Sequence, residues 1–263
     1  AQTYSLDVSL FERFVNMRLP HVTLTTQRRM HPDISSLIRP SIYKDLKDDP
    51  STLNHPDVRG MCHRLFFMTH QVPEDNAGGE VSSSKINKHE AGIAARLALY
   101  LTYHKYKVKD IVILTMYLGQ VRLIRSMLKH KDFSPIADVR VVTTDNYQGE
   151  ESDIIILSIV RSNKEGNIGF LKRENRICVA LSRARNGMFV IGNMDMLRQK
   201  SVLWNKICGD AEARRLLGPS LVLQPCKTHD DSQLEVTNAD DFLNAPLGGC
   251  GKLCLATFPD CGH

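Results

Sequence analysis

Short runs of apolar residues, each bounded by polar segments, constrain the fold of this chain more than any other feature. Many of their residues are β-branched, and the runs are largely apolar throughout rather than alternating with polar positions. Strands of this kind are typical of a parallel sheet whose two faces are both covered by helices. The runs fall at residues 65–68, 111–114, 139–142, 154–160 and 188–191.

Helical patterns, with apolar residues three or four positions apart, separate these runs, as Ile93 and Leu97 illustrate. The alternation of strands and helices predicts an α/β fold with a mostly parallel sheet and helices on both faces. Ligands of such sheets bind at the carboxyl ends of the strands. Helices are expected at residues 1–19, after Pro32, from Ser84 onward, and at residues 121–128, 175–185 and 196–217, the last broken at Gly209.

The net charge of +5 is unevenly distributed along the chain. Residues 161–185 carry seven basic and two acidic side chains, whereas residues 223–263 carry two lysines and six acidic side chains. A concentrated basic window favours an anionic partner, either a nucleic acid or a nucleotide. A solvated basic face is the alternative interpretation.

The seven cysteines are not arranged as a disulfide framework, since three lie in the last 14 residues and the others are scattered. This distribution favours a reducing compartment, and we expect the cytoplasm. No run of about 18 apolar residues predicts a membrane span, and the first ten residues do not resemble a signal peptide. Because an initiating methionine is absent, we expect the chain to be a fragment.

Two polar segments next to expected strands contain candidate binding residues. Arg28 and Arg29 directly follow Gln27 and precede a helix that begins at a proline, where arginines suit phosphate; a surface basic pair is the alternative. Tyr117 and Gln120 follow an expected strand. An aromatic ring and an amide there can contact a nucleic-acid backbone, and ordinary helix capping is the alternative.

Two further segments lie between expected strands. Residues 143–151 concentrate hydroxyl, amide and carboxyl groups around Gly149, which permits a tight turn. Arg183 and Arg185 precede the last strand, and arginine offers a planar fork of donors that fits phosphate oxygens. On the expected helix the two arginines would point about 200° apart. One would then reach a γ-phosphate while the other packs or braces it; two solvated helix arginines are the alternative.

In their order and spacing, these segments resemble the second RecA-like domain of superfamily 1 helicases of the up-frameshift RNA helicase type. The family consensus runs Q-Y-R-M-H-P, T-P-Y-x-x-Q, V-D-x-F-Q-G-R-E and N-V-A-L-T-R-A-R. The counterparts are QRRMHP at 27–32, TMYLGQ at 115–120, TDNYQGEE at 144–151 and CVALSRAR at 178–185. The resemblance covers roughly residues 20–195 and implies the RecA-like P-loop NTPase fold.

The resemblance also implies roles for single residues. Arg29 and Arg183 would reach the γ-phosphate of ATP, with Arg183 as the arginine finger. Gln27 would contact the base and Glu151 the ribose, and Gln148 with Gly149 would couple nucleotide to nucleic acid. The implied nucleotide residues are Gln27, Arg28, Arg29, Gln148, Gly149, Glu151, Arg183 and Arg185, and the expected nucleic-acid residues are Thr115, Tyr117, Gln120, Thr143 and Thr144.

The chain departs from the family pattern in several places. Arg28 stands where an aromatic residue stacks on adenine, although a guanidinium can also stack. Glu150 replaces an arginine and removes a positive charge near the expected nucleotide. The sequence contains neither G-x-x-x-x-G-K-[ST] nor the acidic magnesium pair of the first RecA-like domain. We therefore expect ATP and Mg²⁺ to bind together with that first domain, and this chain alone neither to hydrolyse ATP nor to unwind.

The last residues contain soft metal ligands. Cys250, Cys254, Cys261 and His263 suit zinc and resemble the opening of the NFX-type fingers of helicases in cytoplasmic RNA defence and silencing. The finger is cut short after His263, and a coincidental cluster in a disordered end is the alternative. Cys226 and His229 have no evident partners, so we interpret them as structural.

These observations predict three segments: a RecA-like helicase domain at residues 1–222, with its core at 20–195, an acidic linker at 223–246 and a truncated zinc finger at 247–263. The leading hypothesis is the carboxyl-terminal motor half of an ATP-dependent RNA helicase, with single-stranded RNA and the first RecA-like domain as partners. A DNA helicase of the same superfamily is one alternative. A non-catalytic RNA-sensing or scaffold domain is the other.

Overall fold

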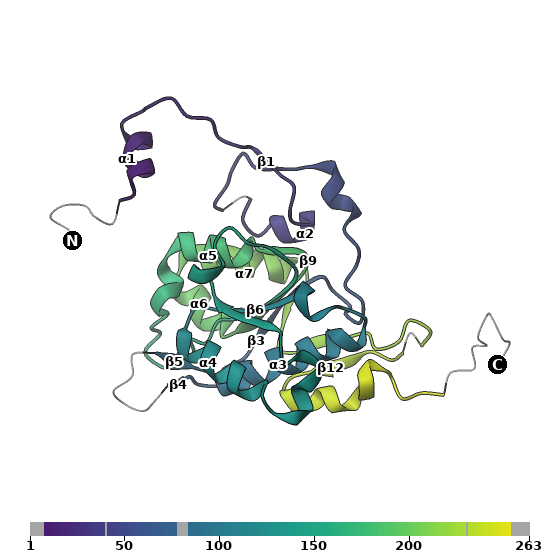
Figure 1. The fold of residues 1–263 in the computed structure, drawn as a ribbon. Coiled ribbons are helices and arrows are strands. Elements are labelled where there is room, and N and C mark those ends of the chain that lie inside the picture. The colour runs from purple at the N-terminus through teal and green to yellow at the C-terminus, as the bar shows by residue number, and fades with distance from the viewer. Residues whose placement is uncertain (1–7, 40, 78–83, 230, 254–263) are drawn as a thin grey trace.

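The protein, seen in a computed structural model, is described at residues 8–39, 41–77, 84–229 and 231–253. Its centre is a six-stranded sheet in the order β10-β3-β9-β8-β6-β7, and every neighbouring pair is parallel (Figure 1). This confirms the predicted α/β class. The strands are β3 (Leu65–Thr69), β6 (Ile111–Thr115), β7 (Arg140–Thr143), β8 (Ser152–Ser158), β9 (Ala184–Gly192) and β10 (Leu217–Gly218).

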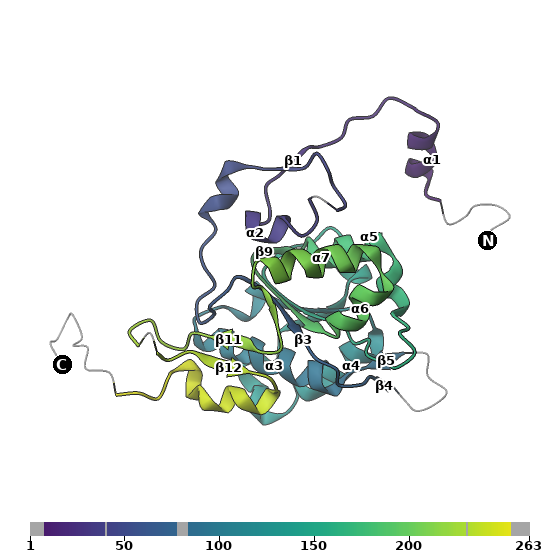
Figure 2. The ribbon, with the colours of Figure 1, turned by 180° about the vertical axis from the view of Figure 1, so that it is seen from behind.

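Both faces of the sheet are buried. Because successive side chains on a strand point in opposite directions, one strand contributes to the cores on both faces. Along β8, Ile155 and Leu157 enter one apolar core, and Ile154 and Ile156 enter the other. Figures 1 and 2 show α5, α6 and α7 over the first face and α3 and α4 over the second. Their bounds are α3 (Lys88–Tyr103), α4 (Leu118–Met127), α5 (Glu174–Leu181), α6 (Met194–Lys200) and α7 (Val202–Ala213).

Shorter elements surround this sheet. Three two-stranded pairings flank it: β1 (Thr26–Gln27) with β2 (Lys47–Asp48), β4 (Asp75–Asn76) with β5 (Lys85–Ile86), and β11 (Leu221–Leu223) with β12 (Leu234–Val236). The 3-10 helices include η4 (Lys131–Ile136), η5 (Asp145–Tyr147), η6 (Gly169–Lys172) and η7 (Ala239–Asn244). Among the described residues, no helix has the length and apolar character to span a bilayer.

The amino-terminal segment is less regular than the apolar spacing predicts. Of the helix expected at residues 1–19, the described part forms only α1 (Leu10–Asn16), which buries no residue. Both views show α1 well away from the sheet (Figures 1 and 2). The helix predicted after Pro32 is present as the single turn α2 (Pro32–Ser35), with Ile34 fully buried.

The expected helix at residues 175–185 is too long, and this changes the setting of both arginines. Helix α5 ends at Leu181, and β9 begins at Ala184 because it pairs with the start of β8. Arg183 therefore directly precedes a strand and Arg185 lies within it. The premise that both arginines lie on one helix was wrong. Residues 196–217 also differ from prediction: Gly209 lies inside α7, and the break falls at Ser201, whose side chain caps α7.

Residues 223–246, expected as an acidic linker, contain regular structure that packs on the domain. Strand β12 pairs antiparallel with β11. Asn238 forms a capping box with Asp241 at the start of η7, so acidic side chains serve as helix caps here. Phe242 is buried, and its ring lies 6.0 Å from that of Tyr100 on α3. The domain divisions at residues 222 and 246 stay predictions.

Candidate functional site

The parallel sheet separates the expected site residues into two groups. Because all strands run in one direction, the segments before β8 and β9 lie at one edge, which we call the amino edge. Glu151, Arg183 and Arg185 lie at this edge. The segments after β6 and β7 lie at the opposite, carboxyl edge, with Thr115, Thr143 and Thr144. The expectation that ligand contacts gather at the carboxyl ends of the strands therefore does not hold for the nucleotide group.

Gln27 fixes the turn that presents Arg29 at the amino edge. Its side-chain oxygen accepts from the backbone N–H groups of Arg29 and Met30, at 2.9 and 2.8 Å. Its amide nitrogen donates to the Met30 carbonyl and to Asp48, both at 2.7 Å. Both ends of the amide are thus engaged within the protein, so a contact with a base would require one of these bonds to break.

Arg29 joins segments that are more than 120 residues apart in the sequence. Its Nε donates to Glu151 Oε2 at 2.6 Å, and its Nη1 donates to the Ser182 carbonyl at 2.9 Å. The neighbouring His31 backbone N–H donates to the Arg185 carbonyl at 3.0 Å, which holds the whole turn against the start of β9. The order of the motifs therefore brings Arg29 and Arg183 to one place.

Arg183 is half-buried, and its partners are uncharged. Its guanidinium donates to the carbonyls of Val179 and Glu150, at 2.9 and 3.2 Å, and to the Ser182 hydroxyl at 2.8 Å. Among the described residues no carboxylate forms an ion pair with it. Burial, and next the repulsion of Arg29, lower the pKa of Arg183. A buried cation beside a second cation is costly without an anion, so this position suits a phosphate.

Three exposed side chains border the two arginines. Glu151 lies between Arg29 and Arg185, whose Nε is 3.9 Å from Glu151 Oε1 and 3.7 Å from Asp153. Arg28 is 79% exposed and bonds Asp49 at 2.9 Å. Its guanidinium is therefore accessible for stacking on a base.

Glu150 does not leave an uncompensated negative charge at this edge. It forms a two-pronged ion pair with Arg140, the first residue of β7, and one of the two contacts measures 2.6 Å. The hydrogen bonds from Arg140 lower the pKa of Glu150. The family pattern has an arginine at position 150. This chain has a carboxylate there instead, and that carboxylate has its own cationic partner.

The segment between β7 and β8 connects the two edges directly. It leaves β7 at Thr143, beside the end of β6, and reaches Glu151 beside Arg29. Gln148 and Gly149 are exposed within it. Gly149 has φ +87°, a conformation that favours glycine, and an added Cβ would meet no atom within 4 Å. Backbone conformation, rather than lack of space, therefore selects glycine here.

The expected nucleic-acid residues are mostly buried, which sequence reasoning did not foresee. Gln120 is fully buried; its amide accepts from Asn87 N–H at 2.8 Å and donates to Ser158 Oγ at 3.0 Å. A direct contact of Gln120 with nucleic acid therefore does not fit this structure. The buried members are Thr115, Tyr117, Gln120 and Thr144, and Thr143 is half-buried.

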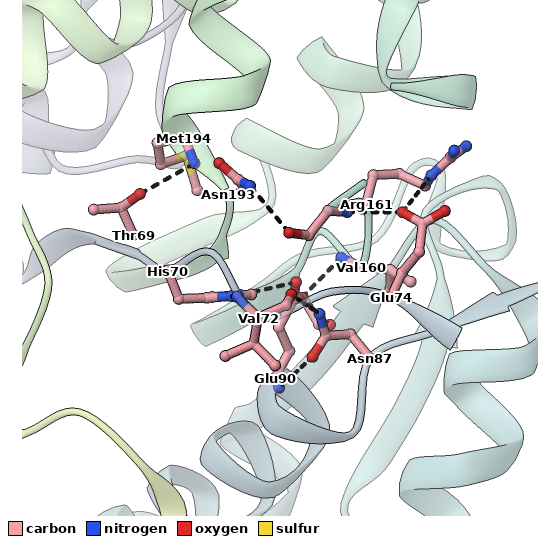
Figure 3. A network of polar contacts seen from close by, with 12 residues as sticks. Thr69, His70, Val72, Glu74, Asn87, Glu90, Val160, Arg161, Asn193 and Met194 are labelled. Carbon is pink, nitrogen blue, oxygen red and sulfur yellow. Dashed lines mark hydrogen bonds and ion pairs between the residues drawn. The ribbon is translucent and has the colours of Figure 1, made fainter. Parts of the chain in front are cut away.

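A buried carboxylate organises the carboxyl edge. Glu90 on α3 is fully buried, and its Oε2 accepts from Ser158 Oγ at 2.6 Å and from the Val160 backbone N–H at 2.8 Å. Its Oε1 lies 3.1 Å from His70 Nε2, so the carboxylate joins α3 to the ends of β3 and β8 (Figure 3). Asn87 is the N-cap of α3, and its side-chain oxygen accepts from the Glu90 backbone N–H at 3.1 Å. An acidic residue within an apolar helical segment was the available signal.

A second buried ion pair lies beside it. Arg161 Nε bonds Glu74 at 2.9 Å, with both side chains 7% exposed (Figure 3). Its Nη1 donates to the Tyr117 hydroxyl at 3.2 Å. The preceding Val160 has φ +73°, which is strained for a β-branched residue. Arg161 is thus neutralised inside the protein and does not add to the basic surface of residues 161–185.

The carboxyl-terminal cysteines are only partly described. Cys254, Cys261 and His263 lie outside the described residues. Cys250 lies beside Cys226 and His229, and the three ligand atoms are all within 4.8 Å of one another. The interpretation of Cys226 and His229 as a pair without partners was therefore wrong, because it could not anticipate that the chain returns through β12 and η7 to bring Cys250 beside them.

Comparison with known proteins agrees with this geometry. The AAA domain family matches residues 6–195. The chain is 44% identical over its full length to the NFX1-type zinc finger-containing protein 1 of Mus musculus. It is 41% identical over 202 residues, 76% of the chain, to the helicase required for RNAi-mediated heterochromatin assembly 1 of Schizosaccharomyces pombe. It is 31% identical over 222 residues, 81% of the chain, to the regulator of nonsense transcripts 1 homolog of Drosophila melanogaster.

The chain spans only 13%, 20% and 18% of the length of these three relatives, respectively. The family match leads to one assignment, and the meeting of Arg29, Glu151 and Arg183 at the amino edge agrees with it. The chain belongs to the AAA domain family of superfamily 1 helicases of the up-frameshift type.

Proposed function

We propose that this chain is the second motor half of an ATP-dependent RNA helicase and supplies an arginine pair to ATP held by a first RecA-like domain. The observation that carries the proposal is the setting of Arg183, a half-buried guanidinium beside Arg29 with no carboxylate partner among the described residues. Such a position favours an anion that arrives from outside the chain.

The amino edge fits a nucleotide in its donor set. Bound ATP with Mg²⁺ supplies the phosphoanhydride bond whose cleavage powers a motor of this class. Arg183 would act as the finger on the γ-phosphate, and Arg29 would add a second cation. Glu151, which already orients Arg29, would accept from a ribose hydroxyl, and Arg28 is accessible for stacking on the base.

The carboxyl edge would support nucleic acid rather than bind it with the buried side chains. Gln120, Thr115 and Thr144 stiffen this edge, and contacts to a backbone would come from the exposed or half-buried groups around them, such as Thr143. The segment from Thr144 to Glu151 would couple the two edges. RNA as the track is supported by relatives whose names refer to RNAi and to nonsense transcripts. A DNA track is the alternative, and the cytoplasm is the compartment that we propose.

The test uses the parent protein, which contains both motor halves. We expect ATP turnover to be stimulated by single-stranded RNA more than by DNA of the same sequence, and the isolated chain to show no turnover. Measurable ATP hydrolysis by the isolated chain would refute the division of the active site between two domains. Equal or stronger stimulation by DNA would refute the RNA assignment.

A further inference from the structure

Two cysteines and a histidine meet at the loop that joins β11 to β12. Cys226 and His229 follow β11, and Cys250 comes 21 residues after His229, beyond η7. Their Sγ and ring-nitrogen atoms all lie within 4.8 Å of one another, and all three residues are half-buried. His229 Nδ1 is 3.3 Å from Cys250 Sγ.

We propose that Cys226, His229 and Cys250 form a zinc site that fastens the segment around Cys250 to the loop after β11. The proposal does not depend on the motor function. Thiolate and imidazole are the ligands that zinc takes in structural sites, often with two to four residues between the first pair. Cys226 and His229 have this spacing, with two residues between them.

The distances suit a tetrahedral ion with little rearrangement. With Zn–S bonds of about 2.3 Å and Zn–N bonds of about 2.0 Å, neighbouring ligand atoms lie about 3.5–3.8 Å apart. The observed Nδ1–Sγ distance of 3.3 Å and the overall limit of 4.8 Å bracket that spacing. Small side-chain rotations would therefore be sufficient to bring the three atoms onto one ion.

The backbone favours the thiolate that a metal requires. The amide N–H groups of His229 and Thr228 point at the Cys226 sulfur. The contact from Thr228 N–H measures 3.3 Å. Amide groups that donate to a sulfur stabilise its negative charge before the metal arrives.

The surrounding side chains fix the position of the loop. Gln224 Nε2 donates to the Cys226 carbonyl at 2.6 Å and to Ser232 Oγ at 3.2 Å. Ser232 Oγ donates back to the Cys226 carbonyl at 3.1 Å. Lys252 forms an ion pair with Asp231 on the other side of the cluster. These contacts hold the loop that carries the ligands in place. Hydrogen bonds around the ligands of metal sites have the same role.

Metal content of the full chain tests the proposal. Purified reduced chain is loaded with Zn²⁺, freed of excess by gel filtration, and analysed by mass spectrometry for zinc per chain. Cys226→Ser and His229→Asn are each expected to lose about one zinc per chain relative to the parent. Cys62→Ser is the matched control, because Cys62 is another half-buried thiol beside Gln224 but outside the cluster. It is expected to keep the zinc content of the parent.

Cobalt substitution gives a second readout, and its first part uses the unmodified chain alone. Co²⁺ in the parent chain is expected to show thiolate charge-transfer bands and tetrahedral d–d bands, both weakened in Cys226→Ser. Zinc content unchanged in Cys226→Ser and His229→Asn would overturn the proposal. A reduced parent chain that binds no zinc, or a Cys226–Cys250 disulfide found in place of metal under mildly reducing conditions, would overturn it as well.

Discussion

The two edges of the sheet handle charge in opposite ways. At the carboxyl edge, Glu90 and the pair of Arg161 with Glu74 are buried and fully engaged with partners inside the chain. At the amino edge, Arg183 is half-buried without a carboxylate, and Arg29 adds a second positive charge. A buried network in which every charged group has a partner contributes rigidity. A half-buried guanidinium without a carboxylate favours an anion from outside the chain. This difference supports the proposal that the amino edge receives the ligand.

The largest effect is expected when the buried carboxylate of Glu90 is removed from the carboxyl edge. Glu90→Ala would leave Ser158 Oγ, the Val160 N–H and His70 without their acceptor in the interior. We expect a loss of about 3–5 kcal/mol in the free energy of unfolding, measured by urea denaturation. Glu212→Ala, which removes an exposed carboxylate, is the control and should leave the urea midpoint of unfolding almost unchanged. A Glu90→Ala chain as stable as the parent would contradict the role of the network.

The amino edge should respond in activity instead of stability. Arg29→Ala in the parent protein is expected to lower kcat for ATP hydrolysis by about 10²–10³, since it removes one cation from the developing phosphate charge. Arg28→Ala, at the adjacent exposed residue, is the matched control and should raise the KM for ATP with little effect on kcat. If the two variants behave alike, Arg29 has no specific role at the phosphate.

A lower pH should reduce the free energy of unfolding through protonation of His89. Burial, and next the neighbouring His70, lower the pKa of His89 below 6.5. The unfolded chain then binds the proton more tightly, so stability is present above about pH 6.5 and is lost as the pH falls below it. The free energy of unfolding should therefore decrease between about pH 7 and pH 5, and less steeply in His89→Gln. The exposed His130→Gln variant should keep the slope of the parent, and an unchanged slope in His89→Gln would count against this cause.

The smallest effect is expected at the exposed pair of Arg140 and Glu150. Because both side chains are more than 40% exposed, Glu150→Ala should leave the urea midpoint of unfolding almost unchanged. If Arg140 only neutralises the charge of Glu150, ATP turnover by the parent protein carrying Glu150→Ala should stay within a few-fold of the turnover of the unmodified protein. A large loss of turnover would show that the carboxylate takes part in the amino edge itself.

The sequence predicted the strands well because buried β-branched runs carry a local signal. It placed 65–68, 111–114 and 154–160 within about two residues of β3, β6 and β8. It failed at Arg183 and Arg185, because the start of β9 is set by pairing with β8, a contact that residues 182–185 do not encode alone.

The sequence did not predict the partners of the buried polar side chains, because these partners also lie far away along the chain. Glu90 finds its acceptor role with Ser158, 68 positions away, and Gln120 with Asn87 and Ser158. Only tertiary structure decides whether such side chains face water or the interior. The motif order did predict that Arg29, Glu151 and Arg183 belong together, and the amino edge is where they converge.

The proposed motor function requires that the amino edge, and not the carboxyl edge, supplies the finger for phosphate. ATP hydrolysis and RNA binding of the parent protein carrying Arg183→Ala test it most directly when measured side by side. RNA-stimulated ATP turnover is expected to fall by about 10³–10⁵ while RNA affinity is retained. Turnover within about tenfold of the unmodified protein would contradict it, and would favour a domain that senses RNA without a motor function.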